Sequence, residues 1–182
     1  MTNHVLINPE IPAEECGHVE RILKGVKMRL GFVPAGLRLY AVSPPVLEQF
    51  VNMVGYFMEH PRLDMKLMVF IRYLVSSVAN CRFCIDLNAS ILLEMGVTPE
   101  QLEAARNDAD DVPLDNANRT LLKIALASIA APDDVSQADI DLAKAQGFTD
   151  RDVFDAVIIA ANNKAFTHVL RTFKVEDQAA FA

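Results

Sequence analysis

Two cysteines one helical turn apart are the residues of this sequence best suited to chemistry. Cys81 and Cys84 follow directly after a strongly apolar stretch. At this spacing two side chains share one face of a helix, and Asn88, four residues after Cys84, extends that face. The face continues through Ile91 and Met95, so we expect both thiols to point inward. Close cysteine pairs of this kind are typical of catalytic, redox-active or metal-binding sites rather than of structural disulfides in a reducing compartment.

The composition favours one globular domain over residues 1–182. The chain has 182 residues, 52% of them hydrophobic and 23% charged. Its net charge is −7 and no basic run appears, so neither nucleic acid nor a membrane surface is an expected partner. Residues 1–12 lack the blocks of a secretory signal, which predicts a cytoplasmic location. The longest apolar run, 67–78, is shorter than the ~20 residues of a membrane-spanning helix and predicts a buried helix.

Apolar residues recur at helical spacing along almost the whole chain, and no strand pattern appears, so we expect an all-α fold. Candidate capping residues precede several of the helices: Ser43, Asp64, Thr98, Ser136 and Thr149. The aspartate-rich segment 107–113 predicts a solvated loop without core residues, between a core of residues 37–106 and a second helical half, 115–175. The expected helices span residues 12–30, 37–42, 44–59, 65–78, 81–95, 99–106, 115–130, 137–146 and 149–173.

Five short segments together resemble a known family. They are Leu30–Pro34, Ser43–Pro44, Asn80–Cys84, Gly96–Glu100 and Ala145–Thr149. In this order and spacing they resemble the alkylhydroperoxidase D-like group of the carboxymuconolactone decarboxylase family, especially its peroxidase-related branch. The resemblance implies an alkylhydroperoxidase D-like helical bundle that assembles as a homo-oligomer, often a trimer or hexamer. No glycine-rich phosphate loop is present, so we expect no organic cofactor.

The resemblance also implies a catalytic set. In that group a glutamate stands twelve residues before the first cysteine and a histidine four residues after the second. The histidine, held by the glutamate, takes the proton of the second cysteine, and the thiols cycle between dithiol and disulfide. Carried onto this chain, Cys84 is the attacking thiolate and Cys81 its resolving partner. The glutamate and histidine positions are occupied by Val69 and Asn88, neither of which titrates near neutral pH.

Without that relay the thiolate needs another source of stabilisation, because an unperturbed cysteine has a pKa of ~8.5. Three sources are available: the positive end of the helix that begins near Cys81, the side chain of Arg82, and a hydrogen bond from Asn88 to the sulfur of Cys84. The predicted site is therefore Cys84, Cys81 and Asn88. The predicted function is that of an antioxidant thiol peroxidase or disulfide oxidoreductase, which takes a small peroxide or disulfide and an external thiol reductant.

Two other functions remain open on the same scaffold. One is a non-catalytic oligomeric or small-ligand-binding protein, in which Cys84 and Asn88 are core residues. The other is a lyase like carboxymuconolactone decarboxylase, which resembles this chain in fold and uses a charged cleft. Such a cleft needs basic residues that converge on one site. The basic residues close to the cysteine pair in sequence fall on different helix faces, and we expect them in surface ion pairs: Arg62, Lys66, Arg72 and Arg82.

A zinc site is not expected. Cys16 and His18 could complete four ligands with the cysteine pair, but residues two apart on a helix diverge. Three further acids or bases could stand near the thiols. Asp86 lies two residues from Cys84 and should face away from it. His60 is expected at a helix end, and His168 is expected in a polar stripe on the last helix.

Overall fold

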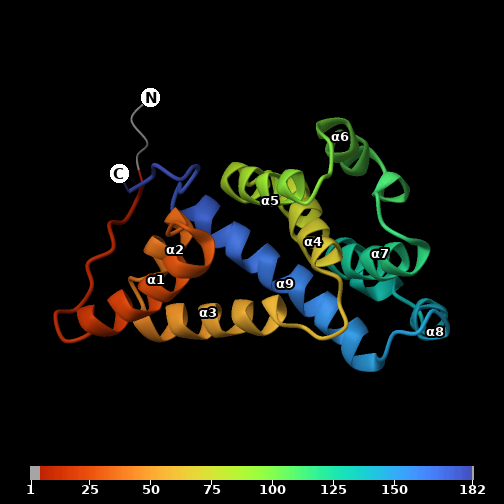
Figure 1. The fold of residues 1–182 in the computed structure, drawn as a ribbon, viewed down its shortest axis with the longest axis horizontal. Helices are drawn as coiled ribbons and strands as arrows, with labels where there is room; N and C mark the ends of the chain where they lie inside the picture. The colour runs from red at the N-terminus through yellow and green to blue at the C-terminus, as the bar shows by residue number, and fades with distance from the viewer. Residues whose placement is uncertain (1–4, 182) are drawn as a thin grey trace. The chain divides into compact units, whose positions relative to one another are not determined.

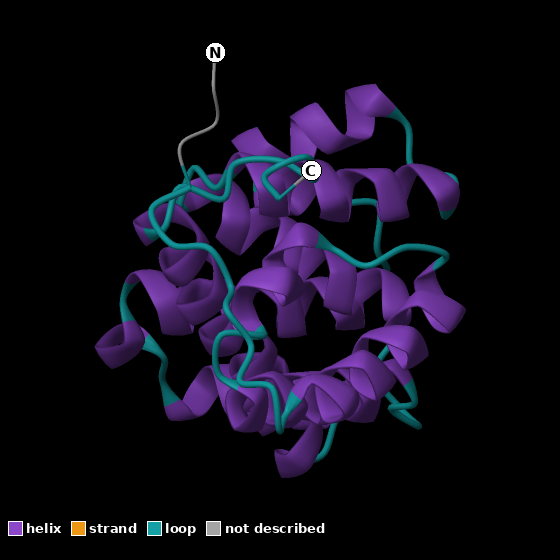
Figure 2. Cartoon of the chain, turned by 90° about the vertical axis from the view of Figure 1, so that its left-hand side faces the viewer, coloured by secondary structure: helices purple, strands orange, loops and turns teal. Residues whose placement is uncertain are grey.

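The computed structural model describes residues 5–181, in which all regular secondary structure is helical (Figures 1 and 2). The prediction of an all-α fold is therefore confirmed, and most predicted helix limits hold within two or three residues. Two short 3₁₀ helices, η1 (Ala109–Asp111) and η2 (Pro132–Asp134), were not predicted. The α-helices are α1 (Cys16–Leu30), α2 (Ala35–Tyr40), α3 (Pro44–Met58), α4 (Met65–Val78), α5 (Arg82–Glu94), α6 (Pro99–Asn107), α7 (Asn116–Ala130), α8 (Gln137–Ala145) and α9 (Asp150–Thr172).

The chain forms two compact units. The first consists of Met1–His60 and Val169–Ala182, and the second of Pro61–His168. Both cysteines of the pair and Asn88 lie in the second unit. The whole predicted site therefore lies within one unit.

The first unit has a core where α1 packs against α3. Its buried residues come from the first three helices: Val19, Val26, Leu37, Ala41 and Leu47. Helix α1 ends at Gly31, whose φ of 79° is the left-handed conformation that glycine adopts without strain. Ser43 occupies the N-cap position of α3, but its hydroxyl makes no capping hydrogen bond, in contrast to the prediction.

Helix α4 is the buried helix that its apolar sequence predicts. It begins at Asp64, whose carboxylate accepts the backbone N–H of Lys66 at 2.6 Å. Leu67, Val69 and Ile71 are each 0% exposed. The helix packs against α5, α6 and α7, so almost its whole circumference is apolar. No helix within residues 5–181 is long and apolar enough to cross a bilayer.

The other predicted caps of the second unit are confirmed. Thr98 and Ser136 each form a reciprocal capping box at the start of α6 and α8. At the start of α9, the buried carboxylate of Asp152 accepts the backbone N–H and hydroxyl of Thr149 at 2.7 and 2.8 Å. The same carboxylate accepts Arg62 Nε at 2.9 Å, which joins the segment before α4 to α9.

The aspartate-rich segment 107–113 is not the solvated loop that its composition predicts. Asp108 caps η1 by accepting the backbone N–H of Asp110 at 2.8 Å. Val112 then follows with 0% exposure, so the segment contributes a residue to the core. The limits between the two units lie at 60–61 and 168–169 and not in this segment.

Candidate functional site

The turn between α4 and α5 positions the first thiol. Asn80 is left-handed, with φ of 50°. Its N–H donates to the carbonyl oxygen of Ser77 at 3.0 Å, and the N–H of Cys81 donates to that of Ser76 at 3.1 Å. This pair of bonds is a Schellman motif, which closes one helix and redirects the chain. Cys81 thereby becomes the N-cap of α5 and is only 1% exposed.

The second thiol lies in the first turn of α5. Cys84 is 2% exposed, and neither cysteine of the pair is in a disulfide. The inward orientation that the spacing predicts is confirmed. The buried face continues through Asn88 and Leu92, at intervals of four residues, whereas Ile91 and Met95 are only partly buried.

The two thiols affect each other's ionisation. A hydrogen bond with Cys81 raises the pKa of Cys84, burial raises it further, and a hydrogen bond with Ser76 acts in the opposite direction. The thiol of Cys84 therefore holds its proton tightly. Cys81 is the N-cap of α5 and lies at the positive amino end of that helix.

Asn88 does not stabilise the Cys84 thiolate as the sequence predicts. Its Nδ2 donates to the carbonyl oxygen of Cys84 at 2.8 Å, one turn back along the same helix. Its Oδ1 accepts Nε of Arg72 from α4 at 3.3 Å. Among the described residues, no hydrogen bond joins Asn88 to the sulfur of Cys84. The amide instead connects the backbone of the cysteine helix to an arginine.

Arg72 is not in the surface ion pair that we predict for it. Its side chain is partly buried, and this burial lowers its pKa to about 10, so it remains a cation at neutral pH. Within residues 5–181 it forms no ion pair with a carboxylate. Arg62 and Arg82 do form the expected pairs, at 2.9 Å from Asp152 and 3.7 Å from Asp86. Arg82 is therefore directed toward solvent and not back toward the thiols.

Two residues that the sequence reasoning missed complete the surroundings of the thiols. Ser76 is 0% exposed, and its hydroxyl donates to the carbonyl oxygen of Arg72 at 2.6 Å. Asn163 of α9 donates to that carbonyl at 3.0 Å and to the Ser76 hydroxyl at 2.9 Å. The sequence pattern could have indicated Asn163, because it is a polar residue one turn after Ile159 on the apolar face of the last helix.

The other candidate residues lie elsewhere. Val69 is 0% exposed, so the position of the family's glutamate is packed in the core. Asp86 is exposed and paired with Arg82, as predicted. His168 is exposed on α9, with Nδ1 2.8 Å from the carbonyl oxygen of Lys164. His60 stacks edge-on against Tyr56 in the first unit, at a centroid distance of 5.7 Å.

The cysteine and histidine of the zinc alternative have partners of their own. The thiol of Cys16 faces the carbonyl oxygens of Ile11 and Pro12, and His18 lies 3.3 Å from a carboxylate oxygen of Glu48. Within residues 5–181, no group of three or more His, Cys, Asp or Glu side chains could hold a metal ion.

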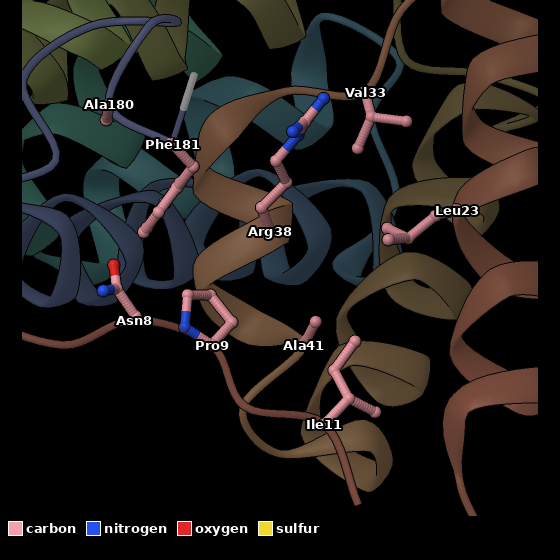
Figure 3. A pocket seen from close by; sticks show the side chains of 9 residues that line it. All are labelled: Asn8, Pro9, Ile11, Leu23, Val33, Arg38, Ala41, Ala180 and Phe181. Atoms are coloured by element: carbon pink, nitrogen blue, oxygen red, sulfur yellow. The ribbon is translucent and has the colours of Figure 1, made fainter. Parts of the chain in front are cut away.

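A hollow of ≈ 540 Å³ lies in the first unit (Figure 3). Its walls come from the segment before α1, from α1 and α2, and from the C-terminal tail. Among the described residues that line it, Arg38 is the only one with a charged side chain, and Phe181 lies beside it in Figure 3. None of the predicted site residues lines this hollow.

The sequence matches one known family. Residues 44–125 match the profile of the carboxymuconolactone decarboxylase family. This range includes α4, the turn at Asn80, and α5 with both thiols. No curated protein matches the chain.

Several solved structures share the fold. One is a peroxidase-related protein from Silicibacter sp. TM1040, with 21% identity over 93% of this chain and 90% of that one, at a TM-score of 0.80. Another is a peroxidase-related protein from Ralstonia eutropha JMP134, described as an alkylhydroperoxidase AhpD core, with 20% identity over 100% and 96% and a TM-score of 0.82. A third is the debrominase Bmp8, with 18% identity over 96% and 94% and a TM-score of 0.75.

Proposed function

Because this chain belongs to the carboxymuconolactone decarboxylase family and has the alkylhydroperoxidase D-like fold, we propose that it is a thiol-dependent peroxidase. The carrying observation is the pair of buried thiols at the start of α5, which are not joined by a disulfide and lie close enough to affect each other's ionisation. Two thiols this close can give up two electrons together by forming a disulfide. Since Cys81 and Cys84 are at most 2% exposed, the proposal favours small organic peroxides over protein disulfides as substrates.

The proposed reaction has two steps. A thiolate of the pair attacks the outer oxygen of the hydroperoxide, the O–O bond breaks, and an alcohol leaves after taking up a proton, so that a sulfenic acid remains. The second thiol then attacks the sulfenic sulfur, water leaves, and a disulfide forms. An external dithiol reduces this disulfide and restores the pair.

We assign the first thiolate to Cys81 and the resolving thiol to Cys84. The N-cap position of Cys81, at the positive amino end of α5, supports this order, which reverses the one that the family resemblance implies. Asn88 has a positioning role, because it binds the carbonyl oxygen of Cys84 and Nε of Arg72 but neither sulfur.

Steady-state turnover tests this proposal. The reduced protein is assayed with dithiothreitol and cumene hydroperoxide, with 2,3,4-tribromopyrrole as a second substrate, because that compound was bound in a structure of the similar debrominase. We expect peroxide turnover that is abolished in Cys81→Ser and in Cys84→Ser and retained in Cys16→Ser. Turnover that survives both substitutions would show that the cysteine pair does not carry the reaction. No turnover with any peroxide would leave the non-catalytic alternative.

We further propose that the protein acts as a homo-oligomer, a trimer or hexamer, in the cytoplasm, where thiol reductants are present. Light scattering on the eluted protein measures the subunit number directly. A monomeric mass would contradict the first part of this proposal.

A further inference from the structure

Arg72 is a cation without an anionic partner among the described residues, one hydrogen bond away from the cysteine helix. Its Nε donates to Asn88 Oδ1 at 3.3 Å, and Asn88 in turn holds the carbonyl oxygen of Cys84 at 2.8 Å. Within residues 5–181 no carboxylate pairs with it. A partly buried charge that is left unpaired is costly, so a protein retains one mainly where something else supplies the opposite charge.

The backbone of Arg72 is also held in place. Its carbonyl oxygen accepts the Ser76 hydroxyl at 2.6 Å and Asn163 Nδ2 at 3.0 Å. With Nε held by Asn88, the guanidinium is fixed in orientation. Its two terminal amino groups make no hydrogen bond to any described residue. These groups form a rigid, planar fork that matches the two oxygens of a carboxylate.

Arg72 lies close to the cysteine pair, and its side chain is more accessible than the two thiols. Ser76, whose hydroxyl donates to the carbonyl oxygen of Arg72, also lies close enough to Cys84 to lower the pKa of its thiol. The side chain of Arg72 remains partly accessible while both thiols are buried. A substrate could therefore place an anionic group at Arg72 and extend its reacting group inward.

We propose that Arg72 binds a carboxylate of the substrate and thereby directs an organic hydroperoxide toward Cys81 and Cys84. This inference rests on the proposed peroxidase function and narrows its substrate class to hydroperoxides that carry a carboxylate. Arg72 is then a specificity-determining residue, and the chemistry itself stays with the two thiols.

A matched pair of substrates tests the inference. Cumene hydroperoxide is compared with the same compound carrying a carboxylate at the para position of the ring. A charge-assisted, two-point contact predicts a kcat/KM at least about tenfold higher for the carboxylate compound in the wild-type protein. Arg72→Gln should abolish this preference, so that the ratio of the two kcat/KM values falls to about one, and Arg72→Lys should restore part of the preference.

Arg82→Gln is the matched control. It removes the same unit charge beside Cys81, but from an exposed side chain already paired with Asp86, so the preference should remain. The inference is overturned if the wild-type protein shows no preference, or if Arg72→Gln lowers turnover of both hydroperoxides equally. A change in subunit number with an unchanged preference would assign Arg72 to an interface and would also overturn it.

A binding experiment separates this inference from the proposed function. Calorimetry compares 4-isopropylbenzoate with the uncharged 4-isopropylbenzamide on the oxidised protein. Binding of the benzoate alone, lost in Arg72→Gln, supports the anion site even if no peroxide is turned over. Equal binding of both compounds, or of neither, overturns the anion site whatever the turnover assay shows.

Discussion

Asn88 Nδ2 lies 2.8 Å from the carbonyl oxygen of Cys84 and is bound to the backbone of that cysteine, not to its thiol. Asn88 stands where the family resemblance implies a histidine, and its amide binds the backbone of the cysteine helix and Arg72. The amide thereby ties the cysteine helix to Arg72 of the neighbouring helix α4. The pKa of the Cys84 thiol is affected instead by Cys81, by burial and by Ser76.

Cys81→Ser should make Cys84 more acidic. In the wild-type protein the hydrogen bond with Cys81 and burial raise the pKa of Cys84, and a nearby Cys81 thiolate adds like charge. Serine cannot ionise near neutral pH, so the repulsion disappears. We expect the alkylation rate of Cys84 to increase at pH 8 and its apparent pKa to decrease, as measured by peptide mapping over a pH series. An unchanged or higher apparent pKa would contradict the coupling.

Ser76→Ala should have the opposite effect on Cys84. The hydrogen bond from Ser76 lowers the pKa of that thiol, so its loss should raise the pKa. A bond of about 1 kcal/mol corresponds to roughly fivefold less thiolate at a fixed pH, and hence to slower alkylation. Ser77→Ala is the control, because the Ser77 hydroxyl donates to the carbonyl oxygen of Tyr73 at 2.8 Å. Equal effects of the two substitutions would show that Ser76 acts only through packing.

Asn88→Asp should suppress the carboxylate preference assigned to Arg72. The new carboxylate would lie where Asn88 Oδ1 now accepts Arg72 Nε, and would pair with the guanidinium from within the protein. Turnover of the carboxylate-bearing hydroperoxide should fall to that of the neutral one. A retained preference would mean that another group binds the substrate anion.

Asp152→Asn should reduce stability at neutral pH and have little effect in acid. Desolvation works to raise the pKa of Asp152, but the hydrogen bonds from Thr149 and Arg62 outweigh it and hold the pKa below its ordinary value of 3.8. The native state therefore favours the ionised form, and this stabilisation is present above about pH 4 and is lost as the pH falls through the native pKa.

The expected difference between wild type and Asp152→Asn is about 1–2 kcal/mol at pH 7, because Arg62 is half exposed and its bond is partly screened. Urea unfolding at pH 7 and at successively lower pH measures it. Asp155→Asn is the control, because Asp155 is a second buried carboxylate of α9 and pairs with Arg151 instead of Arg62. A smaller loss of stability in this variant would show that the effect depends on the Arg62 contact. A difference that persists unchanged at pH 2 would contradict the assignment.

The sequence predicted what depends on local spacing. The limits of α4 follow from the cap at Asp64 and a run that is mostly apolar, and they were predicted to the residue. The inward orientation of Cys81 and Cys84 follows from their places on one helix face, and both are buried.

What the sequence could not predict are contacts between helices. Arg72 and Asn88 are sixteen residues apart and on different helices, and Asn163 lies far along the chain from Ser76. Composition was misleading at Val112, because an aspartate-rich segment can still bury one apolar side chain through its capped turn. Spacing alone placed the Asn88 amide beside a thiol, whereas the amide donates to the backbone carbonyl oxygen of Cys84 in its own helix.

The most direct test of the central proposal is a single-turnover reaction. The reduced protein receives one equivalent of cumene hydroperoxide, and free thiols are then alkylated under denaturing conditions and located by mass spectrometry. We predict a disulfide between Cys81 and Cys84, one cumyl alcohol per disulfide, and a Cys16 that remains fully alkylated. If Cys81 and Cys84 are alkylated as completely as before the peroxide was added, the pair is not a peroxidase site.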